Sequence, residues 1–374
     1  MINNPGMSGN KHKKPMNILY IIASLSSGGA ERQVVELARA LDKSRFRPFI
    51  LIYHNIIQFK EILDAPGITL KVIEKKFKFD PLFPFKLASF AKKNDIDIIH
   101  AYSESAGFWG RLAGKIAGIK SITHIQNTNY SPAWFRLEKA MGWMDKMIIA
   151  NSYAGRDEYL QNMGERKIEV IQNGLNFDLI PEEKKTPHNT DSRKIISVGR
   201  ISRQKNYMCL LKALNIVKNE MEIKDIRADI WGRIMSRDVF DEMMDYIREN
   251  DLGDMVKYRG NSPGVINEIA ESDLLVLSSR WEGFPNVIME SLACGTPVIA
   301  SDVADVKHLV KHGENGFVFP SDDHEVLAER IREFFLLDHE ELVEMGKSGR
   351  EHIKKNYTIE IMAEKTGQIY EEIQ

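Results

Sequence analysis

Short runs of aliphatic and β-branched residues alternate with helical patterns along the chain, and this alternation limits its folds more than any other feature. Between the first two runs, residues 31–41 carry apolar side chains at helical spacing. Such alternation is typical of parallel sheets covered by helices on both faces. The predicted strands are 17–23, 49–53, 97–101, 121–125, 146–150 and 169–172, followed by 195–198, 228–231, 256–259, 274–277, 297–300 and 317–319. The sequence therefore predicts an α/β protein.

A polar segment with two prolines, from Pro181 to Arg193, separates two halves that share this rhythm. The 374 residues are too many for one ordinary core and suit two large domains. We predict an N-terminal domain over 16–182, a linker over 183–193 and a C-terminal domain over 194–357. Residues 1–15 are polar and basic and lack the apolar region of a signal peptide, so they predict a disordered tail.

Composition excludes several classes of protein. A net charge of −2 argues against a general nucleic-acid binder. The two cysteines, Cys209 and Cys294, form neither a disulfide framework nor a metal-ligand motif. No apolar run reaches the roughly 18 residues that a membrane span needs. We therefore expect a cytoplasmic protein that holds no metal.

Two glutamates in the second half mark a candidate ligand site. Glu282 lies in the loop at the carboxyl end of the predicted strand 274–277, and Gly283 allows a tight turn there. Pro285 suits the first position of a helix that we expect to end at Cys294, which places Glu290 about one turn into that helix. Ligands of open α/β sheets bind at this edge, and a helix start favours phosphate. Carboxylates beside a phosphate site suggest a nucleotide sugar.

Two cations are expected at the same edge. Arg200 follows the strand 195–198, and Lys205 lies in the same loop. A diphosphate leaving group gains charge as its bond to the sugar breaks, so cations placed there would stabilise the transition state. A solvated basic loop is the alternative interpretation, and for Arg200 the position directly after a buried strand favours function.

The first half offers weaker signals. Gly28 and Gly29 open the helix after the first strand, where the backbone could approach a phosphate, although this is not the dinucleotide fingerprint. His124 and His100 each lie at the end of a predicted strand. A single histidine is more often structural than catalytic, and either one could be satisfied by the backbone.

Taken together, these motifs resemble those of the retaining glycosyltransferases of family 4 (glycosyl transferases group 1), which have the GT-B fold. The matching elements are residues 28–32, His124, residues 173–174, Gly199-Arg200 with Lys205-Asn206, and residues 282–285 with Glu290. The resemblance implies two facing Rossmann-like domains with a cleft between them. It also implies that a last helix, over 358–374, packs back on the N-terminal domain.

The resemblance assigns roles to these residues. Glu290 would hold the ribose hydroxyls, and Glu282 would lie beside the donor sugar. The backbone of Gly283, Phe284, Pro285 and Asn286 would contact the sugar and phosphate.

Arg200 and Lys205 would neutralise the leaving diphosphate, and Gly28 and Gly29 would form the loop that closes over it. His124 would lie near the sugar on the acceptor side. The reaction would proceed on one face of the sugar and use no cofactor or metal, with a nucleoside-diphosphate sugar as substrate, expected to be a UDP-sugar.

The chain departs from the family pattern at two places. The run Gly232-Arg233-Ile234 lacks a second glycine, and residues 303–307 replace a Gly-Gly-x-x-Glu element, with Lys307 in place of the glutamate. Both departures concern the shape of the donor pocket more than the class of reaction.

The stretch from Lys71 to Lys93 is rich in lysine and phenylalanine, and residues 130–143 add aromatic and basic groups. The favoured interpretation is a helix with core aromatics and solvated lysines. The alternative is contact with an anionic membrane surface. In that case the acceptor would be a lipid-linked glycan of surface-polysaccharide synthesis.

A glycosyltransferase is thus the leading hypothesis. A nucleotide-sugar epimerase of the same fold is a second one, although we find no acid/base set around a sugar. A non-catalytic nucleotide-sugar-binding protein is the third, and Arg200 with Lys205 argues against it, because bond cleavage needs these cations more than binding does.

Overall fold

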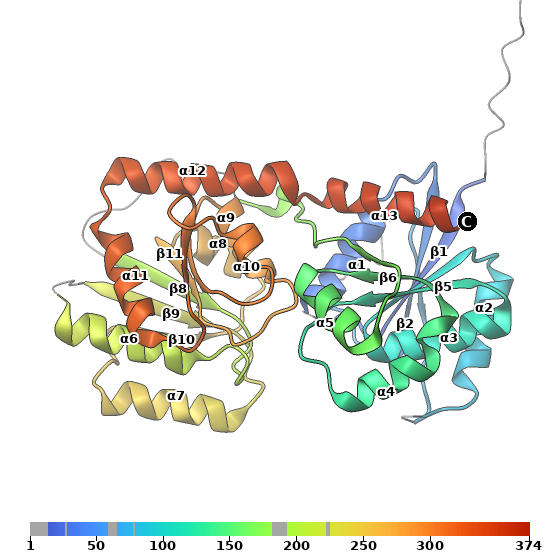
Figure 1. Ribbon diagram of the computed structural model, residues 1–374, viewed down its shortest axis with the longest axis horizontal. Coiled ribbons are helices and arrows are strands. Elements are labelled where there is room, and N and C mark those ends of the chain that lie inside the picture. Colours follow the sequence, from blue (N-terminus) through green and yellow to red (C-terminus); the bar gives the residue numbers. More distant parts are fainter. Residues whose placement is uncertain (1–13, 27, 59–65, 78, 182–192, 222–224) are drawn as a thin grey trace, which may run out of the picture. The chain divides into compact units, whose positions relative to one another are not determined.

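The computed structural model describes residues 14–26, 28–58, 66–77, 79–181, 193–221 and 225–374 (Figure 1). Most of the predicted tail and of the predicted linker, together with Ser27 and Lys78, lies outside these residues. The described part contains two sheets, and every strand pair with a defined register is parallel. The two-sheet α/β architecture predicted from the alternating pattern is confirmed.

The first sheet has the order β3-β2-β1-β4-β5-β6-β7. Its strands are β1 (Met16–Ile22), β2 (Phe46–Ile52), β3 (Thr69–Val72), β4 (Ile98–Tyr102), β5 (Lys120–Ile125), β6 (Asp145–Ala150) and β7 (Ile168–Val170). The strand order reverses between β1 and β4, which are neighbours in the sheet. Such a switch point opens a crevice at the carboxyl ends of the two strands.

The second sheet repeats this plan with the order β10-β9-β8-β11-β12-β13. Its strands are β8 (Arg193–Val198), β9 (Ile226–Trp231), β10 (Val256–Gly260), β11 (Leu274–Leu277), β12 (Val298–Ser301) and β13 (Gly316–Phe319). The order reverses between β8 and β11. The loops that follow these two strands carry the cations and the glutamate predicted from sequence.

Helices connect the strands and cover the sheets. They are α1 (Gly29–Ala40), α2 (Phe83–Lys93), α3 (Glu104–Ala117), α4 (Pro132–Met141), α5 (Tyr153–Met163), α6 (Tyr207–Glu220), α7 (Arg237–Glu249), α8 (Val265–Ala270), α9 (Asn286–Ala293), α10 (Val306–Leu309), α11 (His324–Leu336), α12 (His339–Asn356) and α13 (Ile359–Ile373). Apolar side chains of α6, α7 and α11 pack on one face of the second sheet, and those of α8 and α9 pack on the other. The α2 and α3 helices share a core with β1, β2 and β4.

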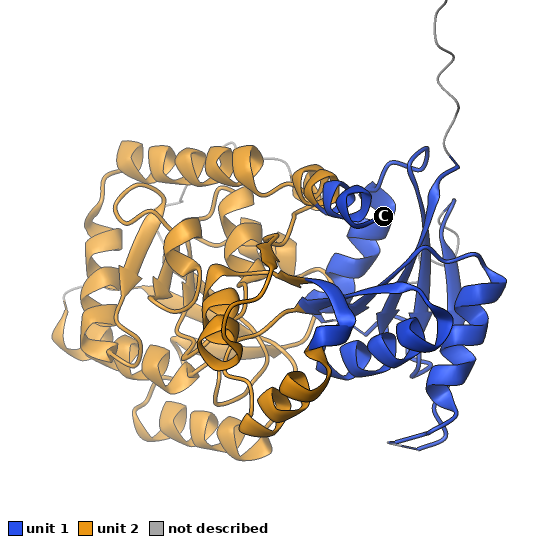
Figure 2. Cartoon of the chain, turned by 45° about the vertical axis from the view of Figure 1, so that its right-hand side comes forward, with its two compact units in different colours: residues 1–124, 143–147, 366–374 blue, residues 125–142, 148–365 orange. Residues whose placement is uncertain are grey.

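Contacts between residues divide the chain into two compact units (Figure 2). Unit 1 comprises Met1–His124, Trp143–Met147 and Thr366–Gln374, and unit 2 comprises Ile125–Gly142 and Ile148–Lys365. The end of α13 therefore belongs to unit 1. There, Lys120 Nζ donates to the carbonyls of Ile373 and Gln374 at 2.6 and 2.5 Å.

Two details of the predicted elements were wrong. The strand β3 was missed, because its four residues alternate between exposed and half-buried and include a lysine. Pro285 is the residue before α9 rather than its first residue, and the helix begins at Asn286. The ring fixes φ of Pro285 near −82° in an extended conformation, so the chain turns into the helix one residue later.

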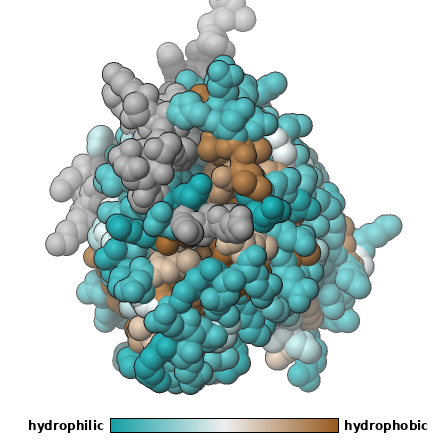
Figure 3. All heavy atoms as spheres, turned by 90° about the vertical axis from the view of Figure 1, so that its left-hand side faces the viewer, coloured by the Kyte–Doolittle hydropathy of each residue, from teal (hydrophilic) through white to brown (hydrophobic). Residues whose placement is uncertain are grey.

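Within the described residues, no helix is long and apolar enough to cross a membrane. Figure 3 shows one face of the molecule as largely hydrophilic, with hydrophobic residues gathered in small areas.

Candidate functional site

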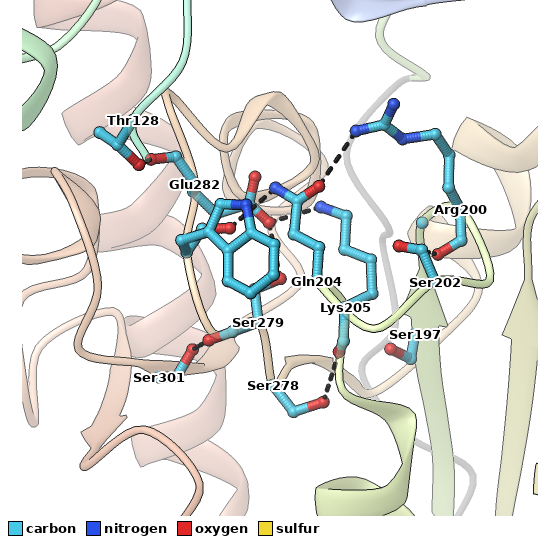
Figure 4. A network of polar contacts seen from close by, with 12 residues as sticks. Thr128, Ser197, Arg200, Ser202, Gln204, Lys205, Ser278, Ser279, Glu282 and Ser301 are labelled. Carbon is cyan, nitrogen blue, oxygen red and sulfur yellow. Dashed lines mark hydrogen bonds and ion pairs between the residues drawn. The ribbon is translucent and has the colours of Figure 1, made fainter. Parts of the chain in front are cut away.

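The switch point of the second sheet brings together two of the predicted loops. One loop follows β8 and carries Arg200 and Lys205, and the other follows β11 and carries Glu282. The two strands are hydrogen-bonded neighbours, so their carboxyl ends lie side by side. The sequence separation of the loops is large, yet the parallel sheet places their side chains within contact distance (Figure 4).

Lys205 and Glu282 form a buried ion pair. Lys205 Nζ lies 2.5 Å from Glu282 Oε1, and the two side chains are only 11% and 8% exposed. The hydroxyl of Ser279 donates to the same carboxylate oxygen at 2.6 Å. Such a pair is costly to break, because removing one partner leaves an uncompensated charge in a poorly hydrated place. Lys205 is therefore fixed by Glu282, and the two predicted site residues act as one unit.

Arg200 lies at the same edge but is exposed. Its guanidinium donates to Gln204 Oε1 at 3.1 Å, and Gln204 Nε2 donates to the carbonyl of Trp281 at 2.8 Å (Figure 4). Gln204 thus links the arginine to the loop that carries Glu282. An exposed guanidinium held in this way can turn its remaining donors toward an anion.

The Glu282 loop makes a close backbone contact with the segment after β5. A Cβ atom added to Gly283 would lie 2.2 Å from the carbonyl oxygen of Gln126, so no larger residue fits without movement. Beside it, Thr128 Oγ1 donates to the carbonyl of Glu282 at 2.7 Å. Glycine at position 283 is therefore required by this close contact.

Phe284 and Asn286 complete the loop. Phe284 is buried in the core that packs under β11 and α9. Asn286, the first residue of α9, accepts a hydrogen bond from Asn173 Nδ2 at 2.7 Å. Glu290 lies farther along the same helix and is half-buried. The structure thus groups Arg200, Lys205, Glu282, Gly283, Phe284, Pro285, Asn286 and Glu290 within unit 2.

The remaining predicted residues belong to unit 1. Gly28 precedes the first turn of α1 and Gly29 begins the helix, while Ser26 Oγ donates to Glu31 Oε1 at 3.0 Å beside them. His124 is the second-last residue of β5 and is 2% exposed. Burial lowers the pKa of His124 to about 3, so its imidazole is neutral at neutral pH.

Comparison with known proteins assigns this architecture to a family. Residues 27–179 match the family model described as Glycosyltransferase Family 4, and residues 180–352 match the model described as Glycosyl transferases group 1. The chain belongs to glycosyltransferase family 4. The protein is thus a glycosyltransferase, and the resemblance drawn from its motifs is confirmed at the level of family and fold.

Several members of the family are similar over most of the chain. The capsular polysaccharide biosynthesis glycosyltransferase CapH of Staphylococcus aureus is 23% identical over 305 residues, covering 78% of this chain and 82% of CapH. An Escherichia coli UDP-Gal:alpha-D-GlcNAc-diphosphoundecaprenol alpha-1,3-galactosyltransferase is 25% identical over 303 residues. That match covers 75% of this chain and 76% of the E. coli protein. Anabaena HepE, solved with UDP-glucose, has a TM-score of 0.82 at 22% identity, and the match covers 96% of this chain and 100% of the HepE chain. The fold is GT-B.

The structure shows the surroundings of the two departures from the family 4 pattern. Gly232, with φ of +154°, packs so tightly that an added Cβ would lie 1.8 Å from the carbonyl oxygen of Gly199, at the start of the Arg200 loop. In the second departure, at residues 303–307, Ala304 takes the left-handed conformation, with φ of +49°. Asp305 then accepts hydrogen bonds from the first two amides of α5, on Tyr153 and Ala154, at 2.9 and 3.0 Å. This element caps a helix.

Three further residues of this family 4 site escaped sequence analysis. Gln204, Ser279 and Thr128 each contact the Glu282 loop or its ion pair. Gln204 lies inside the Arg200 motif, so that motif was the available signal. Ser279 and Thr128 lie in the segments that follow β11 and β5, where the sequence carries no motif. Their contacts with the Glu282 loop are seen only in the folded structure. In the described part of the chain, no three His, Cys, Asp or Glu side chains come together as they would around a metal ion.

Proposed function

We propose that the protein transfers a hexosyl or N-acetylhexosaminyl group from a UDP-sugar to an acceptor hydroxyl, with retention of configuration at the anomeric carbon. The observation that carries this proposal is the group of Arg200, Lys205 and Glu282 at the switch point of the second sheet. Cations at the carboxyl ends of parallel strands suit a diphosphate, and a carboxylate beside them suits sugar hydroxyls.

In the proposed reaction, the bond between the anomeric carbon and the β-phosphate oxygen breaks as the acceptor oxygen bonds to the same face of the sugar. The acceptor proton passes to the leaving phosphate. Arg200 and Lys205 stabilise the negative charge that grows on the diphosphate. Lys205 has three donor hydrogens, so it can keep its bond to Glu282 while it binds a phosphate oxygen. His124, neutral because it is buried, would lie near the sugar on the acceptor side.

The names of the relatives support the finer parts of the proposal. The E. coli relative is named for UDP-Gal as donor and a diphosphoundecaprenol-linked sugar as acceptor, and HepE was solved with UDP-glucose. CapH is named for capsular polysaccharide synthesis. We therefore propose a UDP-sugar as donor and a lipid-linked glycan of surface-polysaccharide synthesis as acceptor.

A panel of nucleotide sugars tests this function. A donor that binds the native state raises the melting temperature, so the panel identifies the donor before any acceptor is known. The matching donor is then assayed with lipid-linked saccharides, and the anomeric configuration of the product is read by NMR. An inverted product would refute retention, and stabilisation by GDP- or ADP-sugars alone would refute the choice of UDP. Conversion of the donor to an epimer without transfer would favour the epimerase.

Glu290→Ala is expected to weaken the binding of UDP about ten- to hundredfold. The proposed carboxylate accepts hydrogen bonds from two ribose hydroxyls, and a hydrogen bond to a charged group contributes about 1.5–3 kcal/mol. Isothermal calorimetry with UDP measures the change. Glu344→Ala, at an exposed position of α12, is the matched control and should bind UDP normally. Unchanged affinity in Glu290→Ala would contradict the assignment.

Transfer is expected to need no divalent metal, so full activity should survive excess EDTA. The support for this proposal is that two cationic side chains already lie where the diphosphate charge would form. Initial rates are compared with and without EDTA, with a magnesium-dependent kinase in the same buffer as a control for chelation. Activity that EDTA abolishes and Mg²⁺ or Mn²⁺ restores would overturn this proposal.

We also propose that unit 1 binds an anionic membrane surface reversibly. The structure buries Phe83 and packs Phe90 against the core, as the first interpretation of the Lys71–Lys93 stretch predicts. Four neighbouring apolar side chains are nevertheless 57–68% exposed: Phe77, Phe79, Leu82 and Phe85. We call these four residues the exposed apolar patch. Lysines border it in sequence, although Lys75 Nζ lies over the ring of Tyr53 and Lys78 lies outside the described residues.

Binding to vesicles should require anionic lipid and weaken at high salt, because each basic residue near such a surface contributes on the order of 1 kcal/mol and salt screens it. The combined change of Phe77, Phe79 and Phe85 to Ser should reduce co-sedimentation, and Lys76→Glu should reduce it further. Leu336→Ser removes a similarly exposed apolar residue, 64% exposed at the end of α11, from outside both candidate stretches and serves as the control. A wild-type protein that stays in the supernatant at low salt would refute membrane binding.

A further inference from the structure

Four rings capable of hydrogen bonding lie on one face of the first sheet. His100 and Tyr102 are two residues apart on β4, so they point to the same face. In the parallel register, Tyr20 of β1 pairs with His100, and His124 of β5 pairs with Tyr102. All four residues are buried, with 0–2% of their surface exposed. A polar group of this size inside a core needs an explanation, because buried polar atoms are normally paired.

The C-terminal helix supplies a fifth ring. Tyr370 of α13 is fully buried, and its hydroxyl lies 2.6 Å from His100 Nδ1. The same hydroxyl donates to the hydroxyl of Tyr20 at 3.0 Å. Tyr370 thus fixes the orientation of His100.

His124 is held by ring contacts. Its imidazole is stacked on that of His100, with centroids 5.4 Å apart and planes 6° apart, and Tyr102 lies against it at 4.5 Å. Within the described residues, neither ring nitrogen of His124 has a hydrogen-bond partner, and the same holds for His100 Nε2 and the hydroxyl of Tyr102. Both nitrogens of His124 are also buried, so a buried water molecule is the kind of group that would satisfy them.

We propose that His100 and Tyr102 are positioning residues for His124, and that Tyr370 extends this support to the C-terminal helix. The inference rests on the proposed role of His124 at the sugar. An imidazole with no hydrogen bond to the protein could turn about its side-chain torsion. The two flanking rings prevent this and hold its nitrogens in one orientation. Tyr370 holds His100, and His100 in turn holds His124.

Tyr370→Phe tests the proposal, because it keeps the ring and removes only the hydroxyl that holds His100. The ring ¹H–¹⁵N signals of His124 are assigned by comparison with His124→Gln and followed in protein labelled at histidine. In Tyr370→Phe we expect the His124 signals to move and kcat to fall about ten- to hundredfold, since small misplacements of a catalytic group have effects of this size. The donor KM should change less than about twofold, because the diphosphate contacts of unit 2 are untouched.

Tyr159→Phe is the matched control. Tyr159 is also fully buried, packs in the core that holds Trp134 and Phe135, and its hydroxyl donates to Glu138 at 2.7 Å. Tyr159→Phe should lower the melting temperature as Tyr370→Phe does, but it should leave both the His124 signals and kcat unchanged. Tyr102→Phe provides a second variant, which keeps the ring contact and should leave the orientation of His124 intact.

The proposal is overturned if the His124 signals in Tyr370→Phe coincide with those of the wild type while the His100 signals move. It is also overturned if Tyr159→Phe lowers kcat as much as Tyr370→Phe does. The NMR comparison does not depend on catalysis. A wild-type protein without transferase activity would refute the proposed function and would leave this comparison interpretable.

Discussion

Arg200→Ala is expected to lower turnover about a hundred- to thousandfold, which corresponds to the loss of about 3–4 kcal/mol of transition-state stabilisation. The charge on the diphosphate grows as the glycosidic bond breaks, so the arginine acts more on the transition state than on the bound donor. Donor affinity should therefore fall much less than kcat. Steady-state kinetics with the donor identified by thermal stabilisation measures both quantities.

The structure makes this variant unusually easy to interpret. Arg200 is exposed and bonded to Gln204, and exposed substitutions usually change stability by less than about 0.5 kcal/mol. Arg203→Ala is the control, because Arg203 lies in the same loop and its side chain is 67% exposed and paired with Asp238. Arg203→Ala should retain normal turnover. Equal turnover in Arg200→Ala and the wild type would remove Arg200 from the mechanism.

Lys205→Met is expected to lower both turnover and stability. It leaves the Glu282 carboxylate, 8% exposed, without the cation, while Ser279 still donates to the oxygen that Lys205 held. Breaking a buried ion pair from one side typically costs about 3–5 kcal/mol. Adding Glu282→Gln removes the unpaired charge, so the double variant should regain part of the stability. Turnover should stay low, because the cation at the diphosphate is still missing.

Urea unfolding of the two single variants and the double variant gives the coupling energy of the pair. Additive losses of stability would show that Lys205 and Glu282 do not act as a unit. Recovery of turnover in the double variant would show that Lys205 only neutralises the Glu282 carboxylate and has no role at the diphosphate.

Sequence reasoning located the strands well because a buried parallel strand is continuously apolar. Leu274–Leu277 was predicted with its observed bounds for this reason. The exposed edge strand β3, by contrast, carries no such signal, because only part of it is buried. Pro285 was placed one residue too far into its helix, since both positions accept a proline.

The residues of the site were predicted individually, but the contacts between their side chains were not. Nothing near Lys205 in the sequence indicates that its amine lies against Glu282, because that contact depends on which strands are neighbours. The order of strands reverses between β8 and β11, and this reversal brings the two loops together. For the same reason, His100 and His124 were found separately at strand ends. Their stacking follows only from the register of β4 and β5.

The course of the C-terminal helix has a consequence for how the protein is made. Thr366–Gln374 belong to unit 1, whose other residues are among the first to be translated. Domains usually begin to fold during synthesis, from the N-terminus onward. Unit 1 must nevertheless wait for Thr366–Gln374, since Tyr370 covers Tyr20 and His100. The nascent protein thus exposes this face until these residues have been made, and a chain cut at Lys365 would keep its site cations and still lack part of the interior of unit 1.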